Sequence, residues 1–233
     1  MMGEVTECDH RGRAFPLGGI CLRIDPKGQD YRNIYKLMIG SIVPRPIAFV
    51  STISPDGVPN LAPFSYFTAC SSNPPCVVFS PTSRGREGGP KDTLANIRAI
   101  GEFVVNIVSE EFAEQMNATS ADYPPEVDEF EISQLTPLAS ELVKPARVAE
   151  SHIQMECKLV DTITVSEKPG GGTLVIGEVL LFHVDERVLA DPGADIFKID
   201  PSKLRAIGRM GGPTYTRTLD RFDIARPVYA RKG

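Results

Sequence analysis

Hydrophobic and polar residues follow a helical period in only a few short stretches of this chain. The longest has aromatic or apolar side chains with the spacing of one helix face at Tyr31, Ile34, Tyr35 and Met38. Asp30 precedes this run, where a side chain that caps the first turn is favoured, and Gly40 follows it. The pattern predicts a helix that begins after Asp30 and ends near Gly40.

Two shorter helices are indicated further along the chain. Residues 93–100 lie between Asp92, a candidate N-cap, and Gly101, a candidate stop. Ser109 is placed to cap another short helix that continues through Met116. Both helices are too short to form the main layer of the fold.

Most of the remaining pattern is typical of strands. We expect them at residues 46–53, 61–70, 76–80, 103–108, 153–159 and 174–184. The segment 153–159 alternates apolar with polar residues, which predicts a half-exposed strand with Gln154 and Glu156 facing water. Residues 169–172, Pro-Gly-Gly-Gly, predict a hairpin loop. Residues 117–150 are expected to run over the surface.

This spacing of strands, with few helices, predicts a mainly β antiparallel barrel or sandwich. We find neither an internal repeat nor a linker that divides the chain. Residues 1–28 mix charge, glycine and proline without a period and are expected to form an N-terminal arm, which leaves 29–233 as one domain.

Composition narrows the class of protein. Glycine and proline number 20 each in 233 residues, above average usage of about 7% and 5%, and this favours turns over long helices. Thirty acidic and 25 basic residues give a net charge of −5, which argues against nucleic acid or an anionic membrane as a partner. The five cysteines are scattered and none forms a C-x-x-C pair, so we expect reduced thiols and no metal site. A soluble, cytoplasmic protein is predicted.

An anion site is the first candidate for chemistry. Residues 85–93 superficially suggest a P-loop, but Asp92 stands between Lys91 and Thr93, so the required Lys-Ser/Thr pair is missing. Lys91 and Thr93 still flank the start of a predicted helix, where backbone N–H groups and the helix dipole favour a phosphate. The alternative is a polar loop in which Asp92 caps the helix.

Small polar residues at the ends of the predicted strands form the second candidate. They could hold the oxygens of a nucleotide on a rigid backbone, or they could simply form turns; they are Ser51, Thr52, Asn60, Ser65 and Ser80. His183, at the end of a strand, is read as a hydrogen-bonded structural residue rather than an acid or base. Neither a serine-hydrolase elbow nor a Rossmann glycine motif is present. Residue chemistry alone therefore leads to an anion-binding β-barrel.

Several separate motifs resemble those of one known family. The run V-P-R-P-I-A-F-V-S-T at 43–52, followed by N-L-A-P-F-S-Y-F at 60–67, is similar to the flavin reductase-like proteins, and most to their flavoredoxin branch. K-D-T-L-A-N-I at 91–97 and G-E-F-V-V-N at 101–106 continue the resemblance. It covers residues 31–217 in order.

The resemblance implies an FMN-binding split barrel, a six-stranded antiparallel Greek key with short flanking helices. It also implies a homodimer with FMN near the subunit interface, in which the partner covers the outer apolar faces of residues 47–53 and 103–108. The cofactor-binding residues implied are Arg45, Ser51, Thr52, Ala62, Pro63, Phe64, Ser65, Ser80, Lys91, Asp92, Thr93 and Arg209. Among them, Lys91 and Thr93 are expected to hold the FMN phosphate.

The function implied is that of an NAD(P)H-dependent flavin reductase, in which NADH or NADPH reduces FMN. FMN itself carries the hydride chemistry, which explains why no acid–base pair stands out. One alternative is a flavoredoxin-like electron carrier that is reduced by a protein partner. Another is a non-catalytic relative that binds flavin or haem, because a fold does not fix an activity. A protein redox or monooxygenase partner is compatible with the first two.

Overall fold

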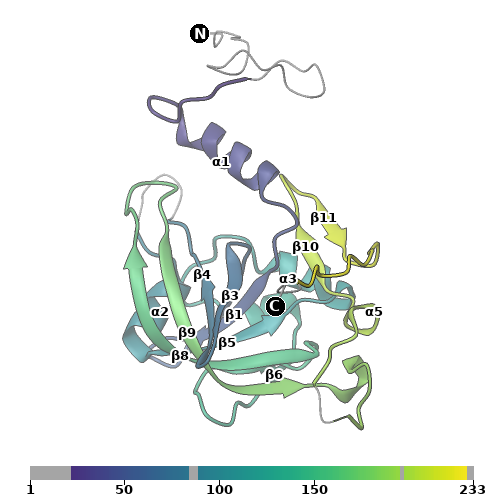
Figure 1. Ribbon diagram of the computed structural model, residues 1–233. Helices are drawn as coiled ribbons and strands as arrows, with labels where there is room; N and C mark the ends of the chain where they lie inside the picture. Colours follow the sequence, from purple (N-terminus) through teal and green to yellow (C-terminus); the bar gives the residue numbers. More distant parts are fainter. Residues whose placement is uncertain (1–21, 84–88, 195–196, 230–233) are drawn as a thin grey trace.

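A computed structural model describes residues 22–83, 89–194 and 197–229 (Figure 1). Most of the expected arm at 1–28 therefore lies outside the described residues, together with Cys8 and Cys21. The loop at 84–88 lies wholly outside them. The described cysteines, Cys70, Cys76 and Cys157, are free thiols. Within the described ranges, every helix is too short or too polar to cross a membrane.

The described part of the chain builds one large sheet from seven antiparallel strands, which confirms the mainly β class. Their order in the sheet is β2-β1-β5-β8-β9-β4-β3. The strands are β1 (Ala48–Ile53), β2 (Pro59–Phe64), β3 (Phe67–Ser72), β4 (Pro75–Phe79), β5 (Glu102–Ile107), β8 (Ile153–Thr164) and β9 (Thr173–Val184). Two small two-stranded sheets accompany it: β6 (Pro137–Leu138) with β7 (Arg147–Val148), and β10 (Ile207–Arg209) with β11 (Tyr215–Arg217).

The sheet has seven strands where six were expected, because residues 61–70 do not form one strand. Ser65 and Tyr66 interrupt this segment, and its two halves, β2 and β3, lie at opposite ends of the strand order. The sheet curls so that these ends approach each other: the rings of Phe64 in β2 and Phe79 in β4 are 5.2 Å apart. A barrel that is open between β2 and β3 results.

Three helices lie close to their predicted positions: α1 (Tyr31–Ser41), α2 (Asp92–Ile100) and α3 (Ala113–Ala118). Two more, α4 (Glu129–Ser133) and α5 (Pro201–Leu204), were not predicted, and short 3₁₀ turns lie at Glu110–Phe112 and Glu186–Val188. The side chain of Asp30 caps α1 as predicted, but the helix continues through Gly40 to Ser41. Gly101 ends α2 with a positive φ of 78°, as expected of a glycine stop. Figure 1 shows α1 standing above one end of the barrel, with β10 and β11 beside its C-terminal end.

Asp92 is not the N-cap of α2. Lys91 occupies that position in an extended conformation, and Asp92 is the first helical residue. The correction has a simple cause: the helix begins one residue earlier than the polar pattern indicated.

The barrel interior is a core of aliphatic and aromatic side chains. It includes Val50, Phe79, Phe103 and Val105, all fully buried. The Phe103 ring lies against Gly177, where an added Cβ would approach its Cζ to 2.2 Å. Only a glycine in β9 fits this ring, and it fixes how closely the two sides of the barrel approach.

A second core covers the outer face of β1 and β2. Phe49 and Leu61 from these strands pack with Phe112, Met116 and Phe130 from the helical segments that follow β5. A partner subunit is therefore not needed to cover the outer faces of residues 47–53 and 103–108, and this part of the expectation is wrong. Residues 108–148 supply much of the cover from within the same chain, and they include most of the segment 117–150 that was expected to run over the surface.

Candidate functional site

Three adjoining cavities follow the open edge of the barrel beside β2. Their volumes are about 620, 60 and 170 Å³. Lys91 and Asp122 line both the first and the second cavity, while Pro63 and Ser120 line both the second and the third. We call this continuous site the β2 cleft. Its size is that of a site for a small molecule or cofactor.

Eight of the twelve predicted cofactor residues line the β2 cleft. They are Ala62, Pro63, Phe64, Ser65, Lys91, Asp92, Thr93 and Arg209. The fold brings them together because β2 ends where α2 begins and because β10 lies beside them. Residues far apart in the sequence thus meet at one edge of the barrel.

Lys91, a residue of the predicted anion site, lines both the cavity of about 620 Å³ and the cavity of about 60 Å³. It is the N-cap residue of α2, so it precedes backbone N–H groups that have no partner within the helix. Its Nζ lies 3.4 Å from Oδ1 of Asp122, and its side chain is about one-third exposed. An ion pair this exposed contributes little to stability, so the ammonium group remains available to an anion.

Thr93 is held differently, within a buried polar network. Its hydroxyl donates to Oδ1 of Asn60 over 2.7 Å, and the Thr52 hydroxyl donates to the same oxygen over 3.2 Å. Asn96 donates its Nδ2 to the Thr52 hydroxyl over 3.1 Å. The side chains of Thr52 and Thr93 therefore connect β1, β2 and α2 to one another, and a contact from Thr93 to a ligand would come from its backbone N–H or a shared hydroxyl.

Glu129 completes this network from α4. Its Oε1 accepts from Nδ2 of Asn60 and its Oε2 accepts from the backbone N–H of Leu61, each over 3.0 Å. Burial raises the pKa of the Glu129 carboxyl, while the donors from Leu61 and Asn60 partly oppose that rise and Asp92 adds to it. The residue is only 6% exposed and still lines the β2 cleft. Nothing in the sequence signals that Glu129 is buried beside the cleft.

Four predicted residues lie outside the β2 cleft. They are Arg45, Ser51, Thr52 and Ser80. The Ser51 hydroxyl donates to the Ala146 carbonyl, and the Ser80 backbone N–H donates to the Tyr66 carbonyl over 2.9 Å. Arg45 is buried and donates to carbonyl oxygens of Ile39 and Met210. The side chains of Arg45 and Ser51, like that of Thr52, thus have hydrogen-bond partners within the protein.

Arg209 brings a second cation to the β2 cleft. Its guanidinium carbon lies 4.4 Å from the centre of the Tyr215 ring, a cation–π arrangement that fixes its direction. Tyr215 in turn donates its hydroxyl to Asn117 over 2.9 Å. The aromatic partner was not expected from the sequence, because 209 and 215 lie on the two strands of a hairpin that no alternation signalled.

Aromatic residues form the wall of the largest cavity. Tyr31 and Tyr35 face it from α1, and Tyr66 faces it from the turn between β2 and β3. Burial raises the pKa of the Tyr66 hydroxyl, Tyr35 adds to that rise and Arg45 opposes it. The sequence placed Tyr31 and Tyr35 on one helix face, but it could not show that this face lies over a cavity.

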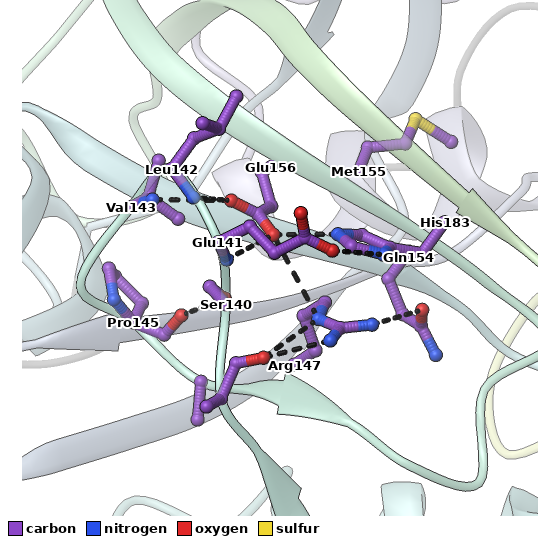
Figure 2. Close-up of polar contacts among 12 residues, drawn as sticks. Ser140, Glu141, Leu142, Val143, Pro145, Arg147, Gln154, Met155, Glu156 and His183 are labelled. Carbon is purple, nitrogen blue, oxygen red and sulfur yellow. Dashed lines mark hydrogen bonds and ion pairs between the residues drawn. The ribbon is translucent and has the colours of Figure 1, made fainter.

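A second polar cluster lies away from the β2 cleft and includes His183 (Figure 2). The Glu156 carboxylate accepts from His183 Nε2 over 2.7 Å and from the backbone N–H groups of residues 141–143. Gln154 and Glu156 are both buried, so the prediction that they face water is wrong. Another segment covers this face of β8: the backbone N–H groups of residues 141–143 donate to Glu156, and Gln154 Nε2 donates to the Val148 carbonyl over 3.1 Å. His183 is a hydrogen-bonded structural residue, as expected.

Comparison with known proteins identifies the family. The protein-family model named flavin reductase like domain matches residues 39–198, which is more than half of the chain. The chain belongs to the flavin reductase-like family. The expected split barrel is confirmed by solved structures of this kind.

Nitrilotriacetate monooxygenase component B from Bacillus cereus superposes with a TM-score of 0.81 at 37% identity, covering 88% of this chain and 98% of that protein. The 2-nitrobenzoate 2-nitroreductase NbaA of Pseudomonas fluorescens gives a TM-score of 0.78 at 29% identity, with coverages of 91% and 99%. The flavoredoxin of Desulfovibrio vulgaris (Miyazaki F) shares the fold, with a TM-score of 0.64 at 24% identity over 79% of this chain and 92% of that one.

Proposed function

We propose that the protein is an FMN-dependent flavin reductase that takes electrons from NADH or NADPH. The observation that carries the proposal is the β2 cleft, in which an aromatic cavity of about 620 Å³ adjoins the cationic start of α2. A planar ring system with a phosphate tail needs both features in one site. Lys91 is shared between the aromatic cavity and the start of α2, which fits a ligand that extends from one to the other.

The residues of the β2 cleft fit FMN in charge as well as in size. Lys91, the backbone N–H groups at the start of α2 and Arg209 are the candidates for anionic oxygens. Tyr31, Tyr35 and Tyr66 offer apolar faces for a ring. Residues 62–65 line the two smaller cavities next to the aromatic one, and their backbone would orient the ring edge. When bound, FMN supplies hydride and electron transfer, and these residues bind and orient it.

The predicted partners follow from the same proposal. The similarity to a component of nitrilotriacetate monooxygenase supports a role in which this chain supplies reduced flavin to a separate monooxygenase. We further propose a homodimer, a cytoplasmic location and no nucleic-acid or membrane partner. The dimer needs a different interface from the one first expected, because the outer face of β1 and β2 is covered within the chain.

Aerobic oxidation of NADH and NADPH with and without added FMN tests the proposal. Oxidation that depends on the protein and on FMN would support a flavin reductase. A protein that holds a stoichiometric yellow chromophore but oxidises neither nucleotide would instead be a flavoredoxin-like carrier. If the purified protein binds neither FMN nor riboflavin, the flavin proposal is wrong.

A further inference from the structure

Glu129 contacts the strand that forms one wall of the β2 cleft. Both of its carboxylate oxygens accept hydrogen bonds from consecutive residues of β2, one from the Asn60 side chain and one from the Leu61 backbone N–H. Ala62, which follows directly, and Pro63 line the cavity of about 60 Å³. The carboxylate therefore fixes β2 immediately before the residues that face the cleft.

The same network continues to the opposite wall. The Asn60 side chain donates through Nδ2 to Glu129 and accepts through Oδ1 from the Thr93 hydroxyl in the first turn of α2. Glu129 and Thr93 are thus joined through one amide group. Lys91 and the start of α2 form the wall that faces β2. The width of the cavity therefore depends on the position of β2 relative to the start of α2.

A carboxylate is the group that this geometry requires. The side chain at position 129 must accept from two N–H donors at once, and a carboxylate offers one acceptor oxygen to each of them. A glutamine would present one oxygen and one NH₂ group, so one of the two donors would lose its acceptor and face another donor. Burial of the Glu129 carboxylate is costly, and these two bonds offset part of that cost.

We propose that Glu129 is a positioning residue of the flavin site, which sets the relative placement of β2 and the start of α2 and so governs the binding of the phosphate end of FMN. This inference rests on the proposed function, because it assumes that the β2 cleft holds FMN. Glu129 acts through Asn60 and Thr93 rather than by contact with the reacting ring.

A double-mutant cycle tests the connection. The variants are Glu129→Gln, Thr93→Val and the double variant, with Glu131→Gln as a control because Glu131 is exposed on the same helix. FMN and riboflavin dissociation constants are measured by flavin fluorescence. We expect each single variant to weaken FMN about tenfold, the effect of about one lost hydrogen bond. The double variant should weaken it little more than either single one, because both changes break the same connection.

The ratio of riboflavin to FMN affinity separates positioning from general stability. A residue that only stabilises the fold would lower the unfolding temperature and leave this ratio unchanged. We expect the FMN loss in Glu129→Gln to exceed the riboflavin loss about tenfold, while Glu131→Gln matches wild type in every measurement. If Glu129→Gln does not fold, Glu129→Asp retains both oxygens on a shorter side chain and should show a smaller change of the same ratio.

The outcomes distinguish the two proposals. Wild-type protein that binds FMN, together with a folded Glu129→Gln variant of unchanged FMN affinity or unchanged ratio, removes the positioning role and leaves the flavin proposal intact. Effects that multiply in the double variant also remove it. Wild-type protein that binds no flavin overturns both.

Discussion

The carboxylate of Glu156 and the imidazole of His183 meet across β8 and β9, with 2.7 Å between Oε1 and Nε2. The Glu156 side chain is fully buried and the His183 side chain is 16% exposed. Three backbone N–H groups of residues 141–143 point at the same carboxylate (Figure 2). The pair therefore fastens the loop before β7 to the barrel, and the fold depends on a buried negative charge.

Replacement of Glu156 should lower stability in a pH-dependent way. Burial raises the pKa of Glu156, but the donors from Glu141, Leu142 and His183 outweigh it, so the pKa lies below its usual 4.5. Its stabilising effect is thus present above about pH 4.5 and is lost as the pH falls through the lowered value. We expect Glu156→Gln to cost about 1–3 kcal/mol near neutral pH, and less in acid, as measured by urea unfolding.

Glu141→Gln is the matched control for this prediction. The Glu141 side chain is 66% exposed and lies 3.8 Å from His183 Nδ1, so its charge contributes little. We expect its unfolding free energy to match that of wild type within about 0.5 kcal/mol. An equal loss for Glu156→Gln at about pH 7 and about pH 3 would contradict the assigned cause.

The environment of Glu156 could not be predicted from the sequence. Strict alternation predicted that it faces water, and Gln154 and Glu156 do share one face of β8, but residues 141–148 cover this face and nothing local to β8 signals that cover. Strand positions, the start of α1 and the family motifs could be predicted, because they depend on local patterns. The partners of Thr93 and Glu129 could not, because Asn60 joins them across long separations in the chain.

Arg45 should prove to be a structural residue rather than a cofactor ligand. Its guanidinium donates to the carbonyls of Ile39, Ile42 and Met210 over 2.6, 2.8 and 2.9 Å, and so connects the end of α1 to β10. Arg45→Met would leave these carbonyls without their donor, and we expect a loss of about 2–3 kcal/mol in unfolding free energy. Denaturant unfolding of the flavin-free protein measures it. A variant as stable as wild type that binds FMN more weakly would show a direct role in the site.

A homodimer is expected to use the outer face of β9 rather than that of β1. Leu180, Phe182 and Val184 alternate along β9 and are 39%, 49% and 37% exposed. Such a stripe of apolar side chains is typical of an interface. We expect light scattering to give twice the chain mass of 25.4 kDa, and Phe182→Asp to give a folded monomer. A wild-type monomer at micromolar concentration would rule out the dimer, and a dimeric Phe182→Asp variant would place the interface elsewhere.

Lys91 should contribute affinity for the phosphate of FMN and little to the fold. Its ammonium group is partly exposed at the start of α2, and its described ionic partner is the exposed Asp122. A charge-assisted hydrogen bond to phosphate is worth roughly 1.5–3 kcal/mol, so Lys91→Ala should weaken FMN binding about ten- to a hundredfold. Riboflavin binding should be nearly unchanged, because riboflavin has no phosphate. Titration of each flavin by fluorescence measures both.

Asp92→Asn is the control for charge at the same helix start. Asp92 is the first residue of α2, where a negative side chain stabilises the helix dipole by about 0.3–1 kcal/mol. Its replacement should therefore lower the stability of the flavin-free protein slightly. It should also tighten FMN binding, because a negative charge that opposes the phosphate is removed from the cleft. If Lys91→Ala weakens FMN and riboflavin equally, the phosphate does not bind at the start of α2, and Arg209 becomes the candidate for it.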